Sequence, residues 1–109
     1  MKPKIYICGP ITGLPNGNKK AFLKAEKKLK KLNYKPINPR RLVGKTEGKL
    51  EKEYDYYALK KSLQLFLKTN IIYVLKGWVK SKGAVIEHNL ALDMNYEIYY
   101  EEGKYGKQL

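Results

Sequence analysis

The stretch Asn70-Ile-Ile-Tyr-Val-Leu-Lys-Gly-Trp-Val-Lys-Ser-Lys-Gly-Ala-Val-Ile-Glu87 decides the fold and points to a site. An apolar, β-rich run is followed by glycine, a capping serine and helical spacing, which predicts a buried strand, a tight loop and a helix start. The first turn of a helix leaves backbone N–H groups unpaired and carries the positive end of the dipole, which makes an anion site. We expect Glu87 to lie beside a ligand whose phosphate or hydroxyls are held by Ser81 and the amides of Gly83 and Ala84.

Short β-rich segments alternate with longer segments of helical period along the chain. Strands are expected at residues 4–8, 34–38, 70–76 and 96–100, helices at 18–33, 50–68 and 82–94, and a polar connection at 40–49. This alternation predicts a single flavodoxin-like or Rossmann-like α/β domain of three layers, with helices on both faces of a parallel sheet. The expected strand order is 2-1-3-4. That order brings the 9–17 and 77–83 loops together at the carboxyl ends of the first and third strands, where such sheets bind ligands.

Composition limits the class of protein. The chain has 109 residues and a formal net charge of +13, from 23 Lys and Arg against 10 Asp and Glu, which favours anionic partners. The single cysteine, Cys8, cannot form an internal disulfide, and its place in an apolar strand favours a buried, inert thiol. We expect a cytoplasmic protein with no membrane association, since no apolar leader opens the chain and its longest apolar run, 71–75, has five residues. Residues 1–100 would form the domain, and the charged tail 101–109 would be frayed.

The segment after the first loop has an amphipathic pattern. Asn18 is a candidate N-cap. Apolar residues recur at helical spacing, and lysine fills most other positions: Phe22, Ala25, Leu29 and Leu32 against Lys19, Lys20, Lys24, Lys27, Lys28, Lys30 and Lys31. Such a surface is usually a solvated face, although it can also meet phosphate backbones or an anionic membrane. It lacks interleaved aromatic residues and any groove-reading motif, so nucleic-acid binding is a secondary hypothesis.

Several motifs together resemble a known family. They occur in the order Ile5-Tyr-Ile-Cys-Gly-Pro-Ile-Thr-Gly13, Asn18 with Phe22, Ile37-Asn-Pro39 and Gly77-Trp-Val-Lys-Ser-Lys-Gly-Ala-Val-Ile-Glu87. Over about residues 4–100 they resemble the nucleoside 2-deoxyribosyltransferase superfamily, and within it a small branch common in bacteria and their phages. The chain is also similar to the 2'-deoxynucleoside 5'-phosphate N-hydrolases in a first-strand motif and in a Ser-x-Gly-x-x-x-Glu spacing. The residues in register are Tyr6, Cys8, Gly9 and Gly13 for the first, and Ser81, Gly83 and Glu87 for the second.

The resemblance implies an activity and a set of site residues. In the superfamily the glutamate is the nucleophile, the serine and the first-loop amides hold the sugar or its 5'-phosphate, and the site is commonly shared between subunits of a homo-oligomer. Glu87 would therefore attack C1' and expel the base, after which water (in a hydrolase) or a second base (in a transferase) would resolve the intermediate. No cofactor or metal is expected. The substrate-binding residues implied are Tyr6, Gly9, Pro10, Ile11, Thr12, Gly13, Asn18, Ser62, Gly77, Trp78, Ser81, Gly83 and Ala84.

Two positions depart from the superfamily pattern. The family generally has an aspartate in the second helix and another that opens the third strand, where this chain has Ser62 and Asn70. Serine cannot act as a general acid near neutral pH, and such proton transfers contribute about a hundred- to ten-thousand-fold in rate. Asp55 lies two helical turns away, roughly 10 Å along the axis, which is too far for a replacement. The alternative to an enzyme is thus a nucleotide-binding protein of the same fold, a sensor or a sequestering protein with weak or no catalysis.

Some side chains also have a structural interpretation. Ser81 can be a plain N-cap and a ligand contact at once. Tyr6 and Trp78 can stack on a base or simply pack in a strand and a loop. His88 points about 100° around the helix from Glu87, which favours a surface or interface role. The base, the sugar and the need for a 5'-phosphate stay open, although the net charge favours a phosphorylated ligand.

Overall fold

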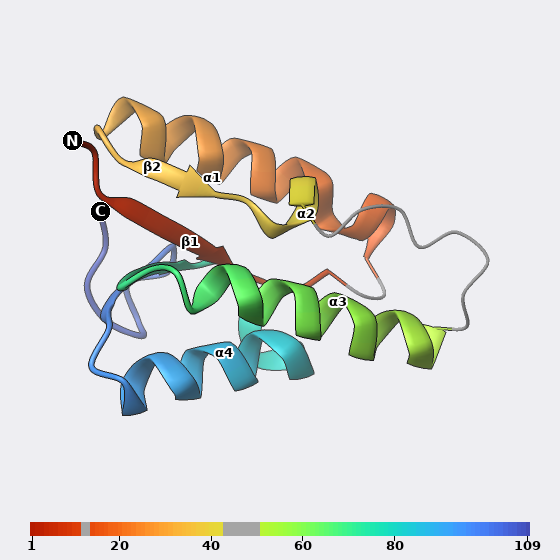
Figure 1. Cartoon of the computed structure of the whole chain (residues 1–109). Helices are drawn as coiled ribbons and strands as arrows, with labels where there is room; N and C mark the ends of the chain where they lie inside the picture. Colours follow the sequence, from red (N-terminus) through yellow and green to blue (C-terminus); the bar gives the residue numbers. More distant parts are fainter. Residues whose placement is uncertain (12–13, 43–50) are drawn as a thin grey trace.

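The computed structural model describes residues 1–11, 14–42 and 51–109, with the backbone alone at residues 42 and 51–58. Its elements are β1 (Lys4–Cys8), α1 (Lys19–Lys31), β2 (Lys35–Ile37), α2 (Pro39–Leu42), α3 (Glu51–Phe66), β3 (Ile71–Val74), α4 (Lys82–Asp93) and β4 (Glu97–Tyr100) (Figure 1). The strands form one sheet in the order β2-β1-β3-β4, and every pairing is parallel. The α/β fold with this strand order is confirmed. Among the described residues, no helix combines the length and the apolar character needed to span a membrane.

Helices cover both faces of the sheet, as Figure 1 shows, with α1 on one side and α3 and α4 on the other. The side chains of β1 alternate between the two layers because successive residues of a strand point to opposite faces. Ile5 and Ile7 pack with Phe22 of α1, whereas Tyr6 and Cys8 pack on the α3 and α4 side. All five side chains are fully buried.

The register brings the carboxyl ends of β1 and β3 level with each other. Cys8 lies opposite Val74, and the Leu75 N–H donates to the Cys8 carbonyl oxygen at 2.8 Å, one residue beyond the end of β3. Both chains then turn away from the sheet. The loops that follow β1 and β3 therefore start side by side.

A short helix begins where only a polar connection was expected. The proline of α2 occupies its first position, where the missing N–H is no loss, and the side chain of Asn38 accepts from the Arg40 N–H at 3.0 Å. The remainder of that expected connection, residues 43–49, lies outside the described part of the chain.

The tail 101–109, which we expected to be frayed, is instead held against the domain. The Tyr100 N–H donates to the Lys107 carbonyl oxygen at 2.7 Å, and Gln108 Nε2 donates to the Glu101 carbonyl oxygen at 3.0 Å. Leu109 packs against the core on the α1 side of the sheet. Because these partners lie beyond the reach of local sequence patterns, the charged composition alone gave the wrong expectation.

Candidate active site

A buried carboxyl lies between β1 and α4. Glu87 is 4% exposed, and the Tyr6 hydroxyl donates to its Oε2 at 2.6 Å. Glu87 reaches the sheet because it shares the inward face of α4 with Ala84 and Ala91, at spacings of three and four residues. Tyr6 reaches the same point because its place in β1 directs it to the α4 side.

Two further polar side chains extend this group. The Cys8 thiol donates to the Ala84 carbonyl oxygen at 3.5 Å and also interacts with the Glu87 carboxyl. Ser62, on α3, is 5% exposed and interacts with the side chain of Tyr6. The linked side chains of Ser62, Tyr6, Glu87 and Cys8 thus come from α3, β1 and α4, and we call them the carboxyl cluster.

Burial sets the protonation of the carboxyl cluster. It raises the pKa of Glu87 from 4.5 to about 7, although the contacts with Tyr6 and Cys8 act in the opposite direction. Burial raises the pKa of Tyr6 and of Cys8 well above their ordinary values, and the charge of Glu87 adds to both shifts. At neutral pH, Tyr6 and Cys8 are therefore neutral donors, while Glu87 exchanges between carboxylic acid and carboxylate.

The loops after β1 and β3 meet at the carboxyl ends of these strands. A side chain at Gly9 would place its Cβ 2.8 Å from Leu75 Cδ1, so only glycine allows this approach. Gly77 has a φ of 88°, which favours glycine, and a Cβ there would lie 3.6 Å from the Pro10 ring. The predicted convergence of the two glycine loops is thereby confirmed from Gly9, Pro10 and Gly77. Thr12 and Gly13 lie outside the described residues.

Asn18 and Ile11 stabilise the first loop. Asn18 precedes α1 but makes no side-chain cap, contrary to our expectation, because its φ of 61° turns the side chain toward the loop. Its Nδ2 instead donates to the Pro10 carbonyl oxygen at 3.0 Å. Ile11 packs against the core on the α1 side of the sheet. Both residues hold the described part of the loop against the domain.

The N-terminus of α4 has the predicted cap. Ser81 Oγ accepts a hydrogen bond from the Ala84 N–H at 3.3 Å. A Cβ at Gly83 would meet Leu59 of α3 at 3.7 Å, so the first turn of α4 lies against α3. A hydroxyl can donate while it accepts, which leaves Ser81 able to donate to a ligand oxygen.

His88 is buried, whereas we predicted a surface or interface role. It is 7% exposed, its Nε2 lies 2.6 Å from the Tyr100 hydroxyl, and burial lowers its pKa. The Trp78 ring packs against it at a centroid distance of 4.2 Å, and Tyr105 of the tail lies 5.3 Å from Trp78. This arrangement is typical of a Trp78 side chain that packs within the protein. The signal was present in the sequence, since His88 lies four residues after Ala84 and three before Ala91, on the buried stripe of α4.

Asn70 lies away from the carboxyl cluster. It is exposed at the amino end of β3, where its carbonyl oxygen accepts from the Glu97 N–H at 3.0 Å. The glycine loop follows the other end of that strand. The side chain of Asp55 is not among those described. Of the two positions that depart from the superfamily pattern, Ser62 alone is part of this site.

The chemistry of the cluster is that of one carboxyl with neutral hydrogen-bond donors. Within the described ranges, no three His, Cys, Asp or Glu side chains are placed to hold a metal ion. A carboxylate that can attack and later leave suits displacement at an electrophilic carbon. The adjoining helix N-terminus suits an anionic or hydroxylated part of the same ligand.

Comparison with known families gives one match. A family model described as "Domain of unknown function (DUF4406)" matches residues 3–100. The matched region contains all four strands and the whole carboxyl cluster. No curated protein matches the chain.

Proposed function

Because the chain belongs to the DUF4406 family, whose description assigns no activity, we propose its function from the site: cleavage or exchange of the N-glycosidic bond of a nucleoside or nucleotide by Glu87. The observation that carries this proposal is a buried Glu87 that is hydrogen-bonded to Tyr6 of β1, a strand whose carboxyl end leads into one of two glycine loops that meet there. Open α/β sheets bind ligands at that edge, between strands whose connections leave in opposite directions.

The proposed reaction has two displacements at the sugar. A Glu87 carboxylate oxygen forms a bond to C1' as the bond from C1' to the base nitrogen breaks, and the base leaves with that electron pair and takes a proton from water. Water then attacks C1', gives a proton to the hydroxide left by the first step, releases the carboxylate and yields the free sugar. Alternatively a second base attacks, gives its N–H proton to that hydroxide and yields a new nucleoside. The Tyr6 hydroxyl orients the attacking carboxylate through its 2.6 Å hydrogen bond.

The protonation of Glu87 predicts the pH dependence of this step. Only the ionised form attacks, and the pKa of about 7 means that roughly half of the molecules are ionised at neutral pH. We expect kcat/KM to rise with pH through that value. Ser81 and the first-turn amides of α4 suit the 5'-phosphate or a sugar hydroxyl, and the positive net charge favours a phosphorylated substrate.

A specific observation favours a second candidate, a protein that binds a nucleotide without efficient turnover. The side chain that meets Tyr6 from α3 is Ser62, which supplies no acid for the departing base. Glu87 is also almost fully buried and partly protonated at neutral pH. Such a protein would retain the ligand and serve as a sensor or a sequestering protein.

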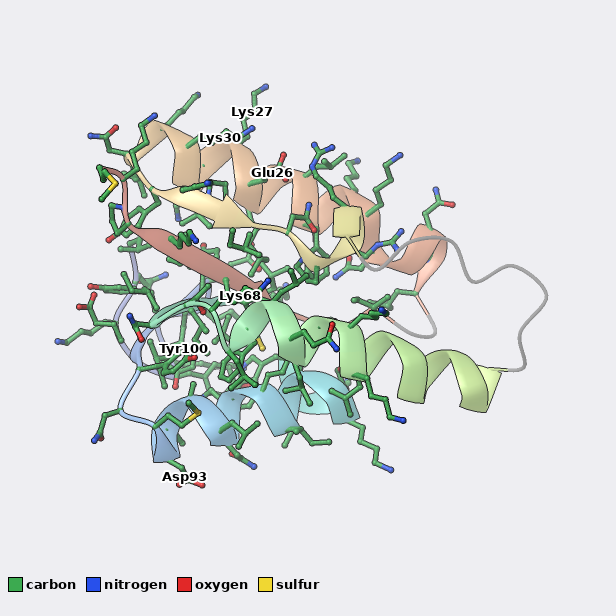
Figure 2. The ribbon with its side chains drawn as sticks, viewed as in Figure 1. Glu26, Lys27, Lys30, Lys68, Asp93 and Tyr100 are labelled. Atoms are coloured by element: carbon green, nitrogen blue, oxygen red, sulfur yellow. The ribbon has the colours of Figure 1, made fainter. Side chains whose placement is uncertain are left out.

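The test measures free base by chromatography after incubation with ribo- and deoxyribonucleosides and their 5'-monophosphates. We expect the native protein to release base from one class and Glu87→Gln to lose at least about a thousand-fold in rate, since the nucleophile is gone. Asp93→Asn is the matched control, because this exposed carboxylate lies at the far end of the same helix (Figure 2). Asp93→Asn should match the native rate.

Calorimetric titration of the same ligands separates the two candidates. Binding without base release would overturn the enzymatic proposal and establish the binding protein. Base release that persists in Glu87→Gln would assign the chemistry to another residue. Neither binding nor release of any member of the panel would contradict both candidates.

A further inference from the structure

The positive charge of the molecule is concentrated in one layer. Residues 1–42 contain twelve Lys and Arg and a single acidic residue, Glu26, whereas residues 82–109 contain three Lys and five acidic residues. The first segment includes α1 and β2, and the second includes α4 and β4. Since α1 and α4 cover opposite faces of the sheet (Figure 1), the protein has one strongly basic face.

The one carboxylate of that basic layer is already neutralised. Glu26 is 6% exposed and accepts two hydrogen bonds from Arg41, both at 2.7 Å, and one from Asn38 at 3.2 Å. The hydrogen bonds from Arg41 lower the pKa of Glu26, so it stays ionised and paired. It offers no competing partner to most lysines of α1. Lys30 alone approaches it, at 3.8 Å.

The lysines of α1 form a continuous exposed surface. Lys20, Lys24, Lys27 and Lys31 follow each other at spacings of four, three and four residues, which aligns them along one side of the helix over about 16 Å. All four are exposed, and Figure 2 shows Lys27 on the side of α1 away from the sheet. Among the described residues, no carboxylate forms a salt bridge with any of the four. We call these four residues the lysine row.

We propose that the lysine row binds the phosphate backbone of double-stranded nucleic acid without sequence preference. A duplex carries one negative charge per about 1.7 Å of axis, so a row of this length can neutralise several phosphates at once. Lysine ammonium groups act as point charges, which position a protein on the backbone but do not read base edges. This surface is separate from the carboxyl cluster and does not depend on the proposed enzymatic function.

The packing of α1 favours a duplex over other polyanions. Its apolar side chains Phe22 and Leu29 are fully buried against the sheet, so α1 cannot insert an apolar face into a bilayer while the domain stays folded. The only aromatic residue of the helix is that buried Phe22, so the outer face offers no stacking platform for single-stranded bases.

The experiment measures fluorescence anisotropy of a labelled 20-base-pair duplex of arbitrary sequence at several salt concentrations. Native protein should bind a second, unrelated duplex equally well. With four phosphate contacts, the affinity should fall about 100-fold between 50 and 200 mM salt. A variant with Lys20→Gln, Lys24→Gln, Lys27→Gln and Lys31→Gln should bind at least about 100-fold more weakly at 50 mM salt. Glutamine keeps the helix propensity, and circular dichroism checks the fold.

A matched control carries the same change in net charge elsewhere. The exposed lysines Lys60, Lys68, Lys80 and Lys107 lie outside α1, and their joint change to glutamine should keep the affinity within about threefold. Equal weakening by the two variants would overturn the proposal, because net charge alone would then explain binding. Absence of duplex binding by the native protein at 50 mM salt would overturn it too. If phosphatidylserine vesicles bind the native protein more tightly than the duplex does, the surface is a membrane contact instead.

Discussion

The two faces of the sheet differ in what they bury. On the α1 side the buried cluster next to the sheet consists of apolar side chains and Tyr73, and the buried Glu26 and Asn38 pair with each other and with Arg41. On the α3 and α4 side, by contrast, the buried side chains include Tyr6, Ser62, Glu87 and His88. A single strand, β1, contributes to both, because its side chains alternate between the faces. Next to the sheet, one side therefore buries an apolar cluster, whereas the other buries polar groups together with apolar side chains.

This division has an energetic consequence. Fully burying Phe22 or Leu29 contributes about 1.5–3 kcal/mol each to the free energy of unfolding, with no polar group to desolvate. A buried carboxyl on the opposite face lowers the free energy of unfolding whenever it is ionised, because a charge is poorly solvated in the protein interior. The α1 side thus offsets the cost of the carboxyl cluster.

The largest expected effect comes from removing one ring on each face. Phe22→Ala and Phe66→Ala should each lower the free energy of unfolding by about 3–5 kcal/mol, since both rings are fully buried. Their effects on Glu87 should differ. Phe66 lies edge-on to Tyr6 at a centroid distance of 5.6 Å, so its loss admits water and lowers the pKa of Glu87, whereas Phe22→Ala leaves that pKa unchanged.

Urea unfolding measures the stability of these two variants, and the carboxyl carbon shift of Glu87 in NMR spectra follows its titration. Each variant serves as the control for the other because the same ring is deleted. An equal change in the Glu87 titration in both variants would contradict the division between the faces.

The next largest effect is the loss of stability caused by ionising the buried Glu87 carboxyl. The pKa of Glu87 is higher in the folded than in the unfolded state, so its contribution to stability is complete below pH 4.5 and is lost as the pH rises through about 7. Glu87→Gln removes this titration. Between pH 5 and pH 8, the free energy of unfolding of the native protein should fall by about 2–3 kcal/mol relative to that of the variant.

Urea midpoints of the native protein and Glu87→Gln at several pH values test this expectation. The titration of His88, whose pKa burial lowers, is common to both proteins and cancels in the difference. Parallel stability curves would mean that Glu87 is ionised throughout this range, and the desolvation argument would then be wrong.

The same comparison explains how much the sequence could predict. The strand order and the meeting of the glycine loops followed from patterns of period two and 3.6 and from the rules of parallel sheets. The cap at Ser81 followed from local backbone chemistry. The strands, helices and cap depend on residues close together in the chain, and the general rules of parallel sheets then bring the distant loops together.

Features that depend on contacts between several layers of the fold were harder to predict from the sequence. The prediction for His88 was wrong because it rested on the angle of about 100° from Glu87, whereas Trp78 and the tail also cover that side of α4. The contact of Cys8 with Glu87 required the relative position of β1 and α4, although the i, i+2 spacing of Tyr6 and Cys8 already placed them on one side. Tertiary geometry decided these outcomes.

The smallest effect concerns the outer surface of α1, where charge and stability oppose each other. Three lysines lie three or four residues from Lys24, namely Lys20, Lys27 and Lys28. Like charges at these spacings destabilise a helix. Lys24→Glu turns these repulsions into attractions and should raise the free energy of unfolding by about 1 kcal/mol at low salt. Lys60→Glu, which changes the net charge equally but has no lysine at these spacings, should leave stability nearly unchanged.

Urea unfolding at 20 mM and 500 mM salt measures the difference between these two variants, which should largely vanish at the higher concentration because salt screens exposed charges. Equal stabilisation by both would assign the effect to net charge and not to the surface of α1. Lys24→Glu could both stabilise the domain and weaken duplex binding. In that case the lysines of α1 lower the free energy of unfolding of the domain in order to bind the duplex. Charge on that surface then serves binding at the expense of stability.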